Sequence, residues 1–195
     1  MTTNRWPTAL GLALALAALT AGLGSGATEL EGWHLAARWT ARTGFLIFLA
    51  VYLASSLVRL CPARWTRSLM RNRRWWGLGF AASHTVHLVA LLMVLHLDPA
   101  PRTVASLVPG TVAYLFILAV VATSSNAAIR ALGHNWKRLH AAGSHVIWLI
   151  FTLSYAKRIP VPETRAIGIV MTTIALAALA TRLVARRARP HAAAA

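Results

Sequence analysis

The sequence predicts an all-α integral membrane protein, a six-transmembrane-helix bundle with both termini in the cytoplasm. Its 195 residues are 57% hydrophobic and only 12% charged, whereas soluble domains carry about 25% charged residues. Six apolar segments approach the length that spans a bilayer, and basic residues are concentrated in alternate connections between them. Because no water satisfies an exposed backbone in hydrocarbon, apolar spans of this length are expected to be α-helices.

The six expected spans follow one another without an internal repeat. In chain order they are residues 7–23, 43–60, 76–97, 105–123, 139–156 and 166–183. The first follows Arg5 and precedes Gly-Ser-Gly-Ala, so a signal peptide cleaved after residues 1–27 is the alternative for this segment. We expect residues 1–189 to form a single domain, and residues 190–195 to be a disordered tail.

The distribution of charge predicts the topology. One set of connections carries fourteen basic residues and no acid: Arg5, Arg59, Arg64, Arg67, Arg71, Arg73, Arg74, Arg130, Lys137, Arg138, Arg182, Arg186, Arg187 and Arg189. The other set carries six basic residues and all four acids: Arg38, Arg42, Arg102, Lys157, Arg158, Arg165, Glu29, Glu31, Asp98 and Glu163. The positive-inside rule places the first set, and both termini, on the cytoplasmic side of a bacterial-type inner membrane.

Composition also excludes some classes of function. The net charge of +16 comes from basic residues at the ends of apolar segments, and not from a soluble basic face. We therefore expect no nucleic-acid partner, and we interpret these residues as topology signals that contact membrane lipid headgroups. No GxGxxG or GxxxxGK[ST] pattern is present, so no nucleotide site is indicated.

Histidines within the third and fifth spans are the clearest candidates for a functional site. His84 and His87 lie in the third span, and His140 and His145 lie in the fifth. An ionisable side chain at membrane depth costs at least a few kcal/mol and usually has a partner and a purpose. Neutral imidazole is also the commonest metal ligand. Two such helices facing each other would hold a heme iron from both sides, which suits electron transfer.

Helical geometry ranks these four candidate ligands. Counted from Trp76 and Trp136 as interface markers, His84 and His145 differ in depth by only about 1.5 Å. His84 and His87 share a helix face, whereas the spacing of His140 and His145 turns them about 140° apart. One of the second pair is therefore expected to be a ligand, and depth alone favours His145.

At these histidines the chain resembles the ferric-reductase-like transmembrane domain family. Within that family it is most similar to heme-binding membrane subunits of bacterial periplasmic methionine-sulfoxide reductase systems. The matching stretches are RNRRWWGLGFAASHTVH (71–87) and TSSNAAIRALGHNWKRLH (123–140). The resemblance implies that His87 is a heme ligand and that His140 is a functional histidine. Six helices with cytoplasmic termini are typical of this family as well.

The chain departs from the family pattern at two positions. Relatives carry a further histidine about 13 residues after the one matched by His140, where this chain has Leu153. Two-heme relatives carry another about 14 residues before the one matched by His87, where this chain has Arg73. Either His145 substitutes, or His87 and His140 bridge a shifted heme, or heme binding is lost. One b-type heme is the most that the sequence predicts.

The favoured function is a b-type heme membrane protein that transfers electrons across the bilayer as a subunit of an oxidoreductase, and not as a complete enzyme. It implies a separate electron donor, such as quinone or flavin from a partner, and an outer-side acceptor, such as a partner reductase or ferric iron. The alternative is a non-redox transporter component or structural anchor whose histidines only pack. A third interpretation replaces heme with copper or iron bound directly, although few other ligands lie at that depth.

Overall fold

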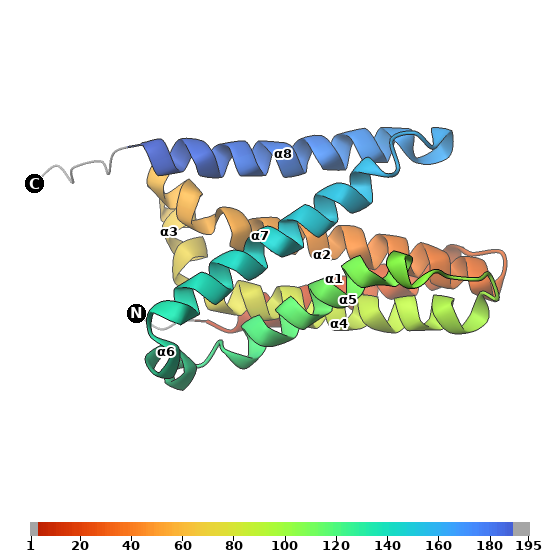
Figure 1. Cartoon of the computed structure of the whole chain (residues 1–195), viewed down its shortest axis with the longest axis horizontal. Helices are drawn as coiled ribbons and strands as arrows, with labels where there is room; N and C mark the ends of the chain where they lie inside the picture. The colour runs from red at the N-terminus through yellow and green to blue at the C-terminus, as the bar shows by residue number, and fades with distance from the viewer. Residues whose placement is uncertain (1–3, 189–195) are drawn as a thin grey trace, which may run out of the picture. The chain divides into compact units, whose positions relative to one another are not determined.

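The computed structural model describes residues 4–188, and every regular element in that range is helical, as the sequence predicts. Eight α-helices and one 3-10 helix follow in chain order (Figure 1): α1 Trp6–Ser25, α2 Glu29–Leu60, α3 Arg64–Arg71, α4 Arg73–Leu97, α5 Val104–Ala122, α6 Asn126–Leu132, α7 His134–Ala156, η1 Pro162–Thr164 and α8 Arg165–Arg187. The predicted tail, residues 190–195, lies outside the described residues.

Five of the helices are long and apolar enough to cross a membrane: α1, α2, α4, α5 and α8 with η1. The expected fifth span lies within α7, which has 23 residues. The amino-terminal part of α7, HNWKRLH, is strongly polar, and α7 is not among the five helices that qualify by length and composition. The protein is thus a helical chain with several candidate membrane spans, whereas a count of six spans and cytoplasmic termini stay predictions.

Helix α2 begins 14 residues before the expected start of the second span at Thr43. Glu29 and Glu31 lie in its first turn, where carboxylates interact favourably with the helix dipole. Further along, Ala36 and Ala37 are buried against Ala90 and Val94 of α4. This packing stabilises a helical conformation in the part of α2 before Thr43, which the charge pattern assigned to a connection between spans.

The chain forms two compact units. Within the described residues, the first contains residues 4–54 together with Arg64–Arg102, and the second contains Ser55–Ala63 and residues 103–188. The first unit is built from α1, most of α2, α3 and α4, and the second from the end of α2 and helices α5 to α8. The single domain expected for residues 1–189 stays a prediction.

Close backbone contact between α1 and α4 organises the first unit. A Cβ built on Gly11 would lie 2.6 Å from the Gly79 carbonyl oxygen, so only glycine permits this approach. Small residues serve this purpose in membrane helices, where burial away from water does not drive helix association. At the start of both helices, the Thr8 hydroxyl donates a hydrogen bond to the Trp75 carbonyl over 3.0 Å.

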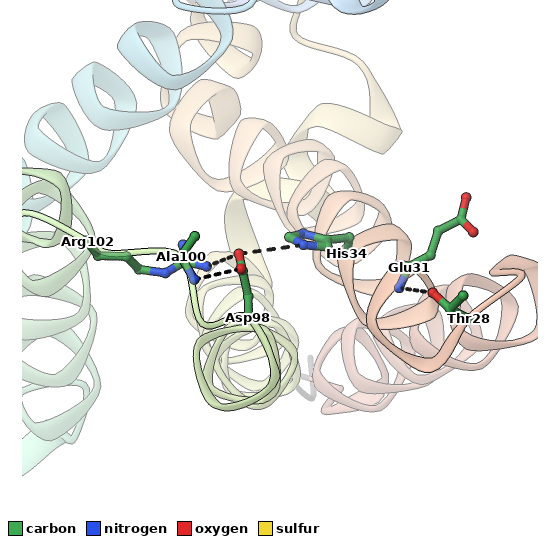
Figure 2. A network of polar contacts seen from close by, with 6 residues as sticks. All are labelled: Thr28, Glu31, His34, Asp98, Ala100 and Arg102. Carbon is green, nitrogen blue, oxygen red and sulfur yellow. Dashed lines mark hydrogen bonds and ion pairs between the residues drawn. The ribbon is translucent and has the colours of Figure 1, made fainter.

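At the other end of the first unit, Asp98 follows α4 and joins it to α2 (Figure 2). Its carboxylate accepts a hydrogen bond from Arg102 at 2.6 Å and another from the Ala100 backbone N–H at 3.0 Å, and it lies 4.0 Å from His34 Nε2 on α2. The first turns of α2 and the end of α4 therefore share one end of the unit. This is the alternation of direction that the charge pattern predicts within residues 4–102.

The second unit is held together by polar contacts between its helices. Trp148 Nε1 on α7 donates a hydrogen bond to the Ala175 carbonyl on α8 over 2.8 Å. Arg59, in the last turn of α2, donates from Nη1 to the Ala185 carbonyl over 3.0 Å. The outward surface of α5 and α8 is apolar, with Leu118 63% exposed, as a helix in contact with lipid requires.

The α1–α4 contact leads to a stability prediction. Gly79→Val is expected to destabilise the protein by about 2 kcal/mol, because the new side chain must displace the α1 backbone. For a chain of this size that lowers Tm by roughly 4–8 °C. Thermal unfolding in detergent measures it. Gly77→Val is the matched control, because a Cβ at Gly77 meets nothing within 4 Å; equal losses in both variants would contradict the close contact.

Candidate functional site

His87 is held by a threonine on the neighbouring helix of the first unit. The Thr40 hydroxyl lies 3.0 Å from His87 Nδ1. The same hydroxyl donates to the Ala36 carbonyl of its own helix over 2.7 Å. Because its single proton is used there, the Thr40 oxygen accepts a hydrogen bond from His87 Nδ1–H. This arrangement selects the tautomer in which Nε2 carries the lone pair.

A metal-binding histidine usually donates its other ring N–H to an oxygen, which fixes both the tautomer and the orientation of the ring. Thr40 supplies such an oxygen to His87. His87 is of intermediate exposure, whereas His84 is buried and only 6% exposed. His87 is therefore the histidine of this unit that meets the requirements of a metal ligand at Nε2.

His84 lies in the interior of the first unit. Its ring packs against Phe80, with ring centroids 4.3 Å apart, and against His87 at 5.4 Å. Gly44 on α2 makes room for it, since a Cβ at that position would overlap the His84 ring. The structure thus brings His84 and His87 together, with His84 in a tightly enclosed position that a bulky ligand would have to open.

His140 is held by a threonine as well, through the opposite ring nitrogen. The Thr123 hydroxyl donates to the Ala119 carbonyl over 2.7 Å and lies 3.0 Å from His140 Nε2. Trp136 stacks on the His140 ring with centroids 4.1 Å apart, and its Nε1 donates to the Thr123 carbonyl over 2.8 Å. These contacts fix the end of α5 against α7. The contact with Thr123 also engages Nε2 of His140, the ring nitrogen that is left available in His87.

His145 lies five residues, or about 1.4 turns, further along α7 and has a cationic neighbour. Its Nε2 is 3.4 Å from Arg186 Nη2 on α8. Because the guanidinium only donates hydrogen bonds, His145 accepts this long contact. The structure describes His84 with His87 in one unit and His140 with His145 in the other, so the pairing of ligands between α4 and α7 stays a prediction.

Other residues occupy the two positions at which relatives in the predicted family carry histidines. Leu153 on α7 is 51% exposed, and Arg73 is the first residue of α4. Among residues 4–188, no group of three or more His, Cys, Asp and Glu side chains gathers in a way that could hold a metal ion. A metal bound only by side chains of this part of the chain is therefore not supported, whereas a heme requires only axial ligands from the protein.

Comparison with known proteins assigns the chain to a family. It is 32% identical over 148 residues to the protein-methionine-sulfoxide reductase heme-binding subunit MsrQ of Cronobacter sakazakii, covering 68% of this chain and 70% of that protein. This chain belongs to the MsrQ family. It is also 30% identical over 161 residues to MsrQ of Salmonella dublin, covering 74% of this chain and 73% of that protein.

A third MsrQ protein, from Pectobacterium carotovorum, is 30% identical over 145 residues, with 64% of this chain and 71% of that protein covered. No family model matches the sequence. No solved structure matches it either. The comparisons confirm the predicted likeness to heme-binding subunits of methionine-sulfoxide reductase systems.

The sequence alone did not identify the residues that position the histidines in this MsrQ-family chain. Thr40 lies 47 residues from His87, and Thr123 lies 17 residues from His140. Threonine is common in membrane helices, where its hydroxyl usually bonds to a carbonyl one turn earlier. Only the packing of α2 on α4 shows that the Thr40 oxygen also reaches an imidazole.

The Thr40 contact leads to a prediction about His87 before any cofactor is added. Thr40→Val removes the acceptor at Nδ1, which is worth about 1 kcal/mol, and is expected to shift the ratio of the two His87 tautomers roughly fivefold towards Nε2–H. Nitrogen-15 NMR of histidine-labelled protein measures the ratio, and His87→Gln identifies the signal. Thr40→Ser retains the hydroxyl and is the control; an unchanged ratio in Thr40→Val would contradict the assigned role.

Proposed function

We propose that this chain is the heme-binding membrane subunit of a methionine-sulfoxide reductase system and transfers electrons across the bilayer. Its MsrQ relatives carry the name of heme-binding subunits of that reductase. Five helices long and apolar enough to span a membrane support a location within the bilayer. We propose that a separate donor supplies its electrons, with a quinone or a partner's flavin as candidates.

His87 is the observation that carries this proposal. Its Nδ1 lies 3.0 Å from the Thr40 hydroxyl, and the residue is of intermediate exposure. His87 would therefore be the residue of the first unit that holds one b-type heme, a role that the buried and enclosed His84 fits less well. A heme bound by two histidines would supply a low-spin iron that exchanges single electrons without binding substrate. Thr40 would orient the imidazole and hold its Nδ1 proton throughout.

The second ligand is proposed to come from α7. His140 and His145 lie five residues apart, so their side chains diverge by about 140° around the helix. His140 could bind through Nε2 only by giving up its contact with Thr123, whereas His145 would give up the longer contact with Arg186. We propose that one of these two histidines binds the iron and that the other retains its contact within the second unit.

The outer-side acceptor is proposed to be a partner reductase. The acids predicted to lie on that side include Asp98, which is tied to Arg102 and close to His34. At this end of the first unit, Asp98 and Arg102 form an ion pair at 2.6 Å. Both the six-span topology and the inner-membrane location belong to this proposal.

The spectrum of the purified protein tests the function. Heme-replete protein in detergent is expected to show a Soret band and a sharp α band in the dithionite-reduced minus oxidised spectrum. His87→Ala is expected to lower the heme content at least about tenfold, because loss of one axial ligand removes a bond that local contacts do not replace. The pyridine hemochrome assay measures the heme content.

His134→Ala is the control, since His134 is exposed at the start of α7. A colourless wild-type protein from heme-replete cells would support the non-redox alternative. Full heme content in His87→Ala would show that the ligand assignment is wrong even if the protein binds heme.

The choice between the α7 histidines has its own test. Of His140→Ala and His145→Ala, one is expected to lose most of its heme and the other to retain at least about half, because the two side chains point in different directions. Heme content per folded protein, with size-exclusion chromatography as the check on folding, separates them. If both variants keep their full heme content, the second ligand does not come from α7.

A further inference from the structure

A small basic pocket lies in the second unit, and one of its residues, Arg186, also contacts His145. It has a volume of about 180 Å³ and is lined by three residues of the last turns of α2 and three of α8: Ser55, Ser56, Arg59, Arg182, Ala185 and Arg186. Three of these six residues are arginines, and two carry hydroxyl groups. We call these six residues the basic pocket.

Among the described residues of the second unit, no acidic side chain lies close to the basic pocket along the sequence. Glu163 is the only acidic residue of the sequence that belongs to the second unit. It precedes α8, and Arg182 lies 17 residues after the first residue of that helix, about 25 Å along the helix axis. Charges that far apart are screened at physiological salt, where the Debye length is about 8 Å. An anion from the surroundings would therefore interact favourably with this cluster of three guanidinium groups.

Contacts within the second unit hold Arg59 and Arg186 in place and leave these two arginines further N–H donors. Arg59 donates from Nη1 to the Ala185 carbonyl over 3.0 Å, and Arg186 Nη2 lies 3.4 Å from His145 Nε2. Each guanidinium has five N–H donors, so one such contact leaves most of them for a ligand. Ser56 is only 5% exposed and lies on the wall of the pocket. A planar fork of donors together with hydroxyl groups is the set that recognises phosphate oxygens.

Size and surroundings narrow the ligand further. Pockets for whole cofactors and drug-sized molecules measure about 300–1,000 Å³, so 180 Å³ suits a single phosphate group and its nearest substituents. Exposed apolar side chains lie next to the pocket along the same helices: Leu60 is 38% exposed, Leu183 46% and Val184 57%. Phosphate contacts beside exposed apolar surface are what a phospholipid requires.

We propose that the basic pocket binds the phosphate group of an anionic phospholipid headgroup. Helices α2 and α8 are both candidate membrane spans, and the pocket lies at the carboxyl-terminal ends of both. These ends carry the charges that the positive-inside rule assigns to the cytoplasmic leaflet. The bound headgroup would join Arg59 on α2 to Arg182 and Arg186 on α8, and so stabilise the packing of the second unit. Free phosphate has the same recognition chemistry and is the other source to be distinguished.

The test uses the full chain in detergent with three added compounds: dioctanoyl phosphatidylglycerol, dioctanoylglycerol with the same tails and no phosphate, and inorganic phosphate. Saturating phosphatidylglycerol is expected to raise Tm by roughly 5 °C, and dioctanoylglycerol to leave it unchanged. If inorganic phosphate at equal concentration gives the full rise, the site takes free phosphate; if it does not, the lipid is the ligand. No rise with either phosphate compound would overturn the proposal.

Paired variants separate a site from general electrostatics. R182Q/R186Q is expected to lose at least about half of the lipid-induced rise. R130Q/R138Q removes the same charge at exposed positions of the second unit, and is expected to keep the rise. Equal loss in both double variants would show that net charge alone attracts the lipid, and would overturn the site.

A measurement on the wild-type protein keeps the proposal testable if R182Q/R186Q does not fold. Phosphatidylglycerol is expected to protect Arg182 and Arg186 from phenylglyoxal modification at least about threefold more than Arg130 and Arg138, because bound phosphate occupies the guanidinium fork. Mass spectrometry of the modified peptides gives the four rates. Equal protection at all four arginines would overturn the proposal. Neither the thermal-shift measurement nor the phenylglyoxal measurement uses heme as a readout. A failure of the lipid site is therefore distinguishable from a failure of the proposed redox function.

Discussion

The requirement that polar groups find partners away from water governs the helices of this protein. Backbone groups meet it within each helix, and several threonine side chains meet it through short bonds to a carbonyl one turn earlier. Thr40 bonds to Ala36 in this way, and Thr123 bonds to Ala119, each at 2.7 Å. In both cases the hydroxyl oxygen is left as an acceptor, and in both it lies 3.0 Å from a histidine nitrogen of another helix.

The two threonine–histidine pairs differ in the ring nitrogen that they engage, and this difference determines what each histidine can do. Thr40 holds His87 at Nδ1, which leaves the distal Nε2 for a metal. Thr123 holds His140 at Nε2 while Trp136 covers the ring, so His140 also joins α5 to α7. Histidine therefore has two different roles in this chain: His87 is oriented with Nε2 available, and His140 joins two helices.

Arginine placement follows from the same scarcity of partners. With four acids against twenty basic residues, most guanidinium groups have no carboxylate to pair with. Asp98 satisfies Arg102 at one end of the first unit (Figure 2). In the second unit, Arg59 turns to a backbone carbonyl and Arg186 to His145. A membrane protein with this balance needs anions from its surroundings, and phospholipid headgroups are the anions that a bilayer supplies.

Several properties of this protein were determined by the sequence itself. Apolar runs of membrane length specify helices in any surroundings without water, and charge alternation specifies their relative directions, which the first unit shows between α2 and α4. The candidate ligands and the family likeness were also readable, because motif residues such as those around His87 and His140 lie close together in the chain.

Tertiary structure decided what depends on contacts between distant segments. The extension of α2 back to Glu29 rests on burial of Ala36 and Ala37 against α4, and the tautomer of His87 rests on Thr40, 47 residues away. The basic pocket likewise exists only where the ends of α2 and α8 meet. Local patterns carry no record of such contacts, since side-chain geometry between helices is fixed only when the helices pack.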